Sequence, residues 1–154
     1  MEIRAAVLHE AHAPLRVETL TLDPPRAGEV LVRVAAAGVC HSDVRLADGD
    51  LGDGRWPTVL GHEGAGVVEA VGPGVGGLSP GERVAFCFVP PCRACGACAA
   101  GRFNLCEVAG EHAWAGTMLD GTSRLHLADG RSVQHFNFVS VSYTHLTLPT
   151  NSRV

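Results

Sequence analysis

The sequence predicts a mainly β domain of the α+β class, with its strands closed into a barrel or packed as a sandwich. Short runs of β-prone residues recur along the chain, and 19 glycines and 9 prolines supply turns between them. A length of 154 residues fits one globular domain, which can bury a core without disulfide bonds. We therefore expect a single β-rich domain.

The expected strands follow one another along the chain with turn residues between them. They cover residues 3–8, 15–22, 29–34, 65–71, 82–89, 122–127 and 132–136. In the third run, Val30, Val32 and Val34 occupy alternate positions, which gives this strand at least one apolar face. We expect that face to pack into the core.

A short helix and a hairpin complete the pattern. Ser42 is a typical residue at the start of a helix and Gly49 is typical beyond its end, so we expect a helix between them. Asp129-Gly130 separates the last two β-prone runs and is typical of the tight turn of a β-hairpin.

Charge and hydropathy each exclude one class of partner. The chain carries 12 Lys and Arg against 16 Asp and Glu, a formal net charge of −4, without runs of like charge. Nucleic-acid binding needs clustered positive charge, so we expect no nucleic-acid partner. No apolar run approaches the roughly 18 residues that cross a bilayer. The sequence therefore predicts a cytoplasmic protein without a membrane partner.

Four of the six cysteines have the spacing Cys92-x2-Cys95-x2-Cys98-x7-Cys106. Four thiolates this close in sequence can complete a tetrahedral shell around one zinc ion, with Zn–S distances of about 2.3 Å, and leave no open position. A closed shell is typical of a structural zinc site. We therefore interpret these residues as a structural metal lobe.

Three alternative roles for these cysteines remain open. The first is a disulfide framework, although disulfide scaffolds are usually shorter and follow a signal peptide. The second is an iron–sulfur cluster, although a ferredoxin run has its fourth cysteine after three residues and a proline behind it, whereas Cys106 follows after seven and precedes Glu107. The third is a set of reduced surface thiols.

Cys87, in an apolar run, is expected to be buried.

Residues 38–43 (GVCHSD) and 61–66 (GHEGAG) contain a second group of ligand types. A thiolate at Cys40, an imidazole at His62 and adjacent carboxylates are the ligands of a catalytic zinc site, which keeps a position for water or substrate. A loop histidine and a buried packing cysteine are the simpler alternatives, and the residues alone leave this choice open.

The motif Gly61-His62-Glu63-x2-Gly66-x5-Gly72 resembles the zinc signature of the medium-chain, zinc-containing alcohol dehydrogenases. Cys40 stands where that family has its first catalytic zinc ligand, and the lobe ending at residues 101–106 (GRFNLC) is similar to its structural zinc lobe. The resemblance covers residues 1–140. It implies a GroES-like, partly open β-barrel catalytic domain with a zinc lobe at about residues 90–108.

The resemblance also implies roles for single residues around the two metals. Cys40 and His62 would be ligands of the catalytic zinc, and Glu63 would lie beside the metal as an occasional ligand. Asp43 would accept the other N–H of a ligating imidazole, which fixes the tautomer of the ring. The structural zinc would be held by Cys92, Cys95, Cys98 and Cys106.

The implied reaction oxidises a small-molecule alcohol to an aldehyde or ketone. Zinc would polarise the alcohol oxygen, and NAD or NADP would accept the hydride. Ser42 would hydrogen-bond the alcohol and begin a proton relay, and His41 would face the cofactor pyrophosphate. Arg45 departs from the family, many of whose members have a histidine there that ends the relay, so another group or water would finish it. The resemblance favours a homo-oligomeric intact enzyme.

Parts of the family pattern are missing from these residues. No cysteine follows Cys106 as a third catalytic ligand, and no strand leads into Gly-x-Gly-x-x-Gly with an acidic residue about twenty positions later. We therefore expect the cofactor-binding Rossmann domain to be absent. Residues 141–154 are rich in Ser and Thr, and Pro149 would cut off a strand. We expect a foreign or disordered tail, flexible from about Ser142, with a genuine divergent tail as the alternative.

Two hypotheses about function follow. The first is the catalytic-domain fragment of a zinc-dependent alcohol dehydrogenase, which is inactive alone because nothing in it holds the nicotinamide. The second is a stand-alone, zinc-stabilised binding module without enzymatic activity. The first is favoured because Cys40, Ser42 and His62 have no purpose in a purely structural module.

Overall fold

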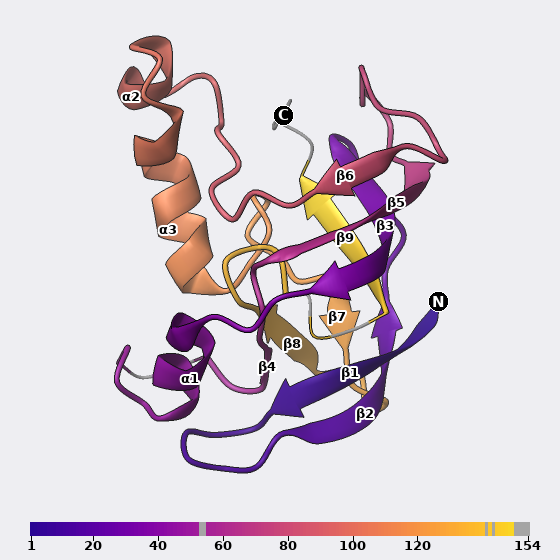
Figure 1. Cartoon of the computed structure of the whole chain (residues 1–154), viewed down its shortest axis with the longest axis vertical. Coiled ribbons are helices and arrows are strands. Elements are labelled where there is room, and N and C mark those ends of the chain that lie inside the picture. The colour runs from indigo at the N-terminus through magenta and orange to yellow at the C-terminus, as the bar shows by residue number, and fades with distance from the viewer. Residues whose placement is uncertain (53–54, 141, 143, 150–154) are drawn as a thin grey trace.

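The computed structural model describes residues 1–52, 55–140, 142 and 144–149 and shows two β-sheets with short helices in the connections (Figure 1). The first sheet is a closed barrel in the order β1 (Glu2–Leu8), β2 (Arg16–Leu22), β7 (Leu125–His126), β8 (Ser132–His135) and β4 (Thr58–Val59). The second has the order β6 (Arg83–Ala85), β5 (Gly64–Val71), β3 (Glu29–Ala37) and β9 (His145–Pro149). The mainly β fold class is confirmed.

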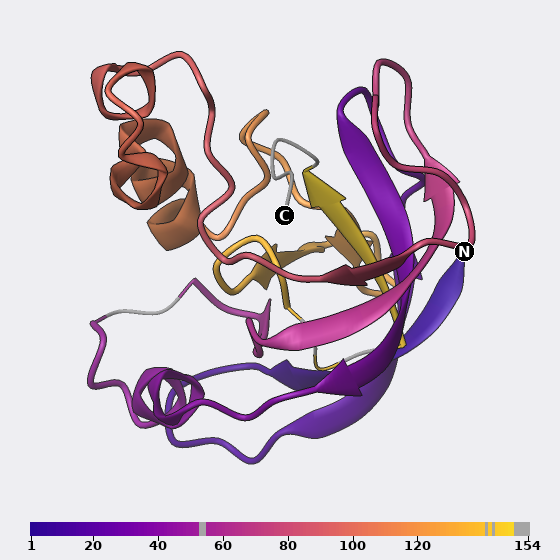
Figure 2. The ribbon, with the colours of Figure 1, turned by 45° about the horizontal axis from the view of Figure 1, so that its top comes forward.

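The helical segments are short and lie outside the two sheets. They are α1 (His41–Ala47), α2 (Gly96–Ala99), the 3-10 turn η1 (Phe103–Leu105) and α3 (Glu107–Ala115). In Figures 1 and 2, α2 and α3 lie together at one side of the molecule, apart from the strands. No helix in the described part of the chain is long and apolar enough to cross a bilayer.

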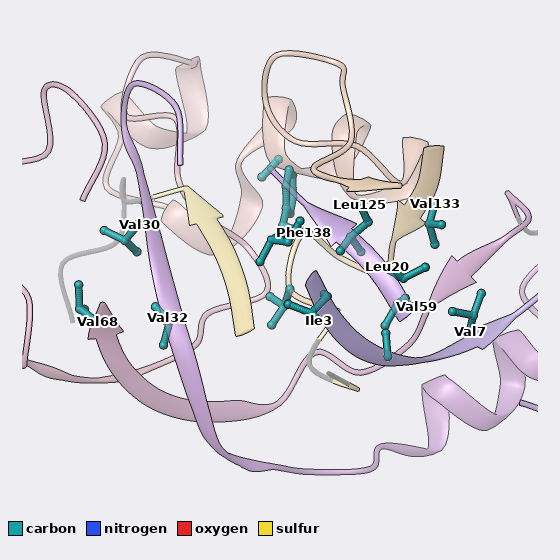
Figure 3. Close-up of a cluster of buried hydrophobic side chains, with 14 of the residues drawn as sticks. Ile3, Val7, Leu20, Val30, Val32, Val59, Val68, Leu125, Val133 and Phe138 are labelled. Atoms are coloured by element: carbon teal, nitrogen blue, oxygen red, sulfur yellow. The ribbon is translucent and has the colours of Figure 1, made fainter. Parts of the chain in front are cut away.

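A cluster of buried side chains joins the two sheets (Figure 3). Ile3 and Leu20 enter it from the barrel, and Val30, Val32 and Val68 enter it from the second sheet. Each such side chain contributes about 1.5–3 kcal/mol by leaving water. The alternating valines of β3 therefore form the contact surface between the sheets, as their spacing predicts.

A buried ion pair also connects the two sheets, and no local pattern in the sequence predicts it. Arg124 has no exposed surface and donates two hydrogen bonds to Glu29, at 2.6 Å from Nη2 to Oε1 and 3.0 Å from Nε to Oε2. Its Nη2 also donates to Asp120 at 2.7 Å. Burial acts to raise the pKa of Asp120, but the hydrogen bonds and charge of Arg124 and the hydrogen bonds from Thr122 together outweigh it and hold this pKa well below its ordinary value. The pair fixes the start of β3 against the segment that enters β7.

The segment after β6 differs from the expected strand. The run 82–89 predicts a longer strand, but β6 ends at Ala85 because it pairs only with the first part of β5 before the chain leaves for the cysteine lobe. Beyond Ala85 the side chains are covered unevenly: Phe86 and Val89 still pack against the core, whereas Cys87 does not. Cys87 is therefore exposed, and the expectation that it is buried is wrong. Helix α3 was not expected from the sequence.

Part of the tail forms a strand, which its composition and Pro149 do not predict. Residues 145–149 form β9, which is antiparallel to β3 with Val30 opposite Leu148. Thr147 is fully buried. Pro149 does not prevent the strand because β9 is an edge strand and the proline is its last residue, where a missing N–H removes no essential ladder bond. Residues 141, 143 and 150–154 of the expected tail lie outside the described residues.

Gly72 is required by a close approach of two backbone segments. Its N–H donates to the carbonyl oxygen of Glu29 at 2.7 Å, and a Cβ at this position would overlap the carbonyl oxygen of Arg26. The backbone would have to move to admit any side chain. The spacing of this glycine in the motif therefore has a packing cause.

Gly72→Ala is expected to lower the free energy of unfolding by about 1–3 kcal/mol because of this overlap. Gly76→Ala is the matched control, since a Cβ at Gly76 has nothing within 4 Å. Urea denaturation of both variants measures the difference. Equal stability of the two variants would contradict the packing cause.

Candidate metal centres

The pairing of β3 with β5 brings two distant loops together. The strands are antiparallel with Ala37 opposite Gly64, so the end of β3 and the start of β5 lie at the same edge of the sheet. Cys40 follows β3 after a short loop, and His62 precedes β5. The Gly38 N–H donates to the Glu63 carbonyl oxygen at 2.8 Å and connects the loops directly.

Cys40, His62 and Glu63 form a cluster that can hold a metal ion. One ligand atom from each lies within 4.8 Å of the others. His62 is buried, Cys40 is half-buried and Glu63 is exposed, so the cluster opens to solvent on one side. A thiolate, an imidazole and a carboxylate with one open side fit a zinc ion that keeps a place for a further ligand.

Two neighbouring side chains approach the His62 ring at its nitrogen atoms. Ser42 Oγ lies 3.3 Å from Nε2, within hydrogen-bond distance. Asp43 Oδ1 lies 3.4 Å from Nδ1, although this nitrogen makes no hydrogen bond with any described residue. The structure thus brings together Cys40, Ser42, Asp43, His62 and Glu63, the residues that the sequence singles out.

The Asp43 carboxylate also accepts two backbone hydrogen bonds that were not expected from the sequence. Its carboxylate is buried and accepts the N–H of Cys40 at 2.9 Å and the N–H of Gly61 at 2.9 Å. It therefore fixes both ligand loops at once. A local signal exists for the first bond, since an acidic residue at the third position of a helix commonly caps the helix start, but the bond to Gly61 depends on the fold.

Aromatic rings hold the His62 imidazole on two sides. Phe136 packs edge-on with ring centroids 5.2 Å apart, and Phe88 packs similarly at 5.6 Å. Neither phenylalanine was singled out from the sequence, because both reach His62 only through the fold. The rings restrict the rotation of the imidazole and shield its faces from water.

His41 and Arg45 lie on α1 but outside this cluster. Both side chains are exposed, and the Arg45 Nε is 3.9 Å from Asp50 Oδ2. The structure therefore leaves His41 accessible to a molecule that approaches from solvent.

The four lobe cysteines converge as their spacing predicts. Their sulfur atoms all lie within 4.8 Å of one another, and Cys92 Sγ is 4.0 Å from Cys98 Sγ. A tetrahedral zinc with Zn–S bonds of about 2.3 Å requires sulfurs roughly 3.8 Å apart, so the lobe fits zinc. All four are free thiols, which gives no support to the disulfide alternative.

Backbone N–H groups point at the sulfur atoms of the lobe. Cys106 Sγ accepts from the N–H of Cys92 at 3.3 Å and from that of Ala109 at 3.4 Å, which caps α3. The backbone N–H of Cys98 lowers the pKa of the Cys95 thiol to about 6, whereas burial raises the pKa of Cys98 to about 12. Such N–H donors stabilise thiolates, the form that binds a metal.

Comparison with known proteins agrees with this geometry. Residues 26–131 match the alcohol dehydrogenase GroES-like domain. The chain belongs to this family. It is 52% identical over 126 residues to an NDMA-dependent alcohol dehydrogenase of Amycolatopsis methanolica, covering 82% of the chain and 33% of that protein. It is 43% identical to the S-(hydroxymethyl)glutathione dehydrogenase of Paracoccus denitrificans, covering 97% of the chain and 40% of that protein.

Solved structures confirm the GroES-like β-barrel. An alcohol dehydrogenase zinc-binding domain protein from Burkholderia ambifaria superposes with a TM-score of 0.90 at 36% identity, over 97% of this chain and 40% of that one. The benzyl alcohol dehydrogenase of Acinetobacter calcoaceticus gives a TM-score of 0.83 at 31% identity, over 97% of this chain and 39% of that one. The chain thus spans about 40% of these solved structures.

The glycine run at residues 72–77 does not form a nucleotide-binding loop. Its glycines have the spacing Gly-x-Gly-x-x-Gly, but the run lies in the connection between the antiparallel strands β5 and β6. No helix follows it in residues 72–85, all of which the structure describes. A dinucleotide loop holds its phosphates at a helix N-terminus, which this connection lacks.

Asp43→Asn is expected to weaken metal binding at the Cys40 and His62 cluster by about 10–100-fold. The amide offers one acceptor oxygen in place of two, so one of the two buried N–H groups loses its partner. This loss also costs about 1–3 kcal/mol of stability. Metal affinity is measured by Co²⁺ titration and stability by thermal unfolding.

Asp48→Asn is the matched control because Asp48 is exposed at the end of the same helix. It should leave both quantities unchanged. Unchanged Co²⁺ affinity in Asp43→Asn would show that Asp43 does not position the cluster.

Proposed function

We propose that the chain is the catalytic-domain portion of a zinc-dependent alcohol dehydrogenase that oxidises alcohols to aldehydes or ketones with NAD or NADP. The observation that carries the proposal is the convergence of Cys40, His62 and Glu63, with the Ser42 hydroxyl 3.3 Å from the imidazole. Membership of the family and the names of the relatives support it. The resemblance also favours a cytoplasmic homo-oligomer as the intact enzyme.

The proposed catalytic metal is a zinc ion held by Cys40, His62 and Glu63. When bound, zinc polarises the alcohol oxygen and the nicotinamide accepts the hydride. Asp43 fixes the loops that carry Cys40 and His62, and its Oδ1, which lies 3.4 Å from His62 Nδ1, would accept the Nδ1–H when Nε2 binds the metal. Phe88 and Phe136 keep the ring in this orientation.

The Ser42 hydroxyl is placed to take the proton that the alcohol loses. Its oxygen accepts the substrate O–H hydrogen bond, and the proton then passes from the serine to the next acceptor. The Arg45 guanidinium cannot act as that acceptor because it is always protonated. Another group or water therefore completes the relay. His41 is exposed at the start of α1, where it would face the cofactor pyrophosphate.

The proposed role of the cysteine lobe is structural. Four thiolates fill the coordination shell of its zinc and leave no position for a substrate. Metal binding at Cys106 also fixes the start of α3, since the same sulfur caps this helix. The lobe is thus a stabilising unit rather than a second active site.

Two zinc ions of different affinity are expected in the purified chain. The lobe should hold one zinc tightly, because structural zinc binds with apparent free energies of about 10–16 kcal/mol in small peptides. The cluster of Cys40, His62 and Glu63 has three protein ligands and one of them is exposed, so its zinc should exchange. Metal analysis before and after dialysis against a mild chelator separates the two.

Cys95→Ser should remove the tight zinc while the barrel stays folded by circular dichroism. Cys87→Ser is the matched control, since Cys87 is exposed and outside both clusters. Iron and sulfide in the lobe, or a second zinc that survives dialysis, would contradict this assignment.

The 154-residue chain alone is expected to bind no nicotinamide cofactor and to show no dehydrogenase activity. Orientation of the nicotinamide against the substrate is worth up to about 7–11 kcal/mol of the barrier, and no described loop cradles its phosphates. Absorbance at the nicotinamide band measures turnover. Reduction of the cofactor that disappears in Cys40→Ala would disprove the prediction of inactivity.

A further inference from the structure

Gly38 lies against the side chain of Glu63, one of the three candidate ligands in the cluster with Cys40 and His62. A Cβ at Gly38 would lie 2.7 Å from Glu63 Oε2, 3.1 Å from its Cβ and 3.7 Å from its Cδ. Nonbonded heavy atoms are best placed about 3.5–4.0 Å apart, so the first two distances are overlaps. The Glu63 side chain thus occupies the space that any larger residue at position 38 would need.

The backbone at Gly38 does not itself require glycine. Its φ lies outside the left-handed region, the conformation that favours glycine. At Gly72 the overlap involves backbone atoms, whereas at Gly38 the nearest atom is the far end of an exposed glutamate side chain. A side chain at position 38 would therefore displace the Glu63 carboxylate and leave the pairing of β3 with β5 in place.

No polar partner in the described part of the chain holds the Glu63 carboxylate. Its oxygens make no hydrogen bond or ion pair there. A long, exposed side chain without such a partner samples several rotamers. Yet a Glu63 oxygen lies within 4.8 Å of the ligand atoms of Cys40 and His62. Packing against Gly38 therefore takes the place of a hydrogen-bond partner for this carboxylate.

A purely structural role accounts for only part of the contact between Gly38 and Glu63. The Gly38 N–H donates to the Glu63 carbonyl oxygen at 2.8 Å and holds the two loops together. This bond uses backbone atoms alone, so an alanine at position 38 could make it equally well. The bond brings the two backbones close, and the missing side chain of Gly38 leaves a notch that the Glu63 side chain fills.

We propose that Gly38 is a positioning residue of the metal centre, because the notch at Gly38 holds the Glu63 carboxylate beside Cys40 and His62 as a third protein ligand. The proposal rests on the proposed function, since it takes this cluster as a metal site. The cluster has no fourth ligand among the described residues, so Glu63 decides whether the chain offers a metal two ligands or three. Gly38 touches neither metal nor substrate and acts only through Glu63.

Co²⁺ binding tests the proposal without any need for turnover. The cysteine lobe is first filled with zinc, and Co²⁺ is then titrated into the second cluster, where the Cys40 thiolate gives a charge-transfer band. Gly38→Ala should weaken Co²⁺ binding by about 10–100-fold and change the visible d–d bands, because water replaces the displaced carboxylate. Gly76→Ala is the matched control, since a Cβ at Gly76 has nothing within 4 Å. It should leave both readouts unchanged.

A double-mutant cycle shows whether Gly38 acts through the Glu63 carboxylate. Glu63→Ala alone should weaken Co²⁺ binding by about 10–100-fold, and it removes the Oε2 and Cδ atoms that a new Cβ would meet. In that background Gly38→Ala should cause no further loss of affinity. A structural role for Gly38 predicts the same loss in both backgrounds. The double variant also keeps the test available if Gly38→Ala alone fails to fold by circular dichroism.

The outcomes separate this proposal from the proposed function. Unchanged Co²⁺ affinity in Gly38→Ala, or a loss that persists in full beside Glu63→Ala, overturns the positioning role and leaves the metal centre standing. Unchanged affinity in Glu63→Ala shows that Glu63 is not a ligand, and the positioning role of Gly38 fails with it. If Cys40→Ala leaves the charge-transfer band in place, Co²⁺ does not bind at this cluster. That result overturns the catalytic metal site of the proposed function together with the role of Gly38.

Discussion

The antiparallel pairing of β3 with β5 is the constraint on which the candidate active site depends. Cys40 and His62 belong to loops that are separated in sequence by α1 and β4, and only this pairing returns the chain to the same sheet edge. Gly66 and Gly72 permit the close backbone approach that the pairing needs. The glycines of the motif therefore support its metal ligands. They allow the two strands to approach closely, and this approach brings the loops that carry Cys40 and His62 together.

The sequence predicts which residues can bind metal better than it predicts the contacts that hold those residues in place. Cysteine spacing in the lobe and the residue types at Cys40 and His62 depend on metal preference, which acts through a few atoms close in sequence. The bond from Asp43 to Gly61 and the packing of Phe136 on His62 arise between segments distant in the chain. Local patterns carry no information about such contacts. For the same reason the apolar run at residues 82–89 suggested a longer β6 and a buried Cys87.

The two metal centres are linked through α3. The helix is capped by Cys106, which belongs to the lobe, and ends before Gly116, whose carbonyl oxygen accepts the N–H of His135 at 2.9 Å next to Phe136, the ring that packs on His62. A lobe without its metal would leave the first turn of this helix without a fixed cap. The structural centre is thereby connected with the support of the His62 ring, although the two clusters share no ligand.

The buried ion pair of Glu29 and Arg124 constrains when the domain can fold during its synthesis. The partners are 95 residues apart in sequence, so during synthesis Glu29 leaves the ribosome long before the guanidinium that neutralises it. A carboxylate without its partner resists burial, which keeps the start of β3 solvated until the later segment emerges. The barrel also cannot close until later strands are made, because β1 pairs with β4 and β2 pairs with β7. The domain therefore folds late and as a unit, after most of the chain has been translated, rather than strand by strand.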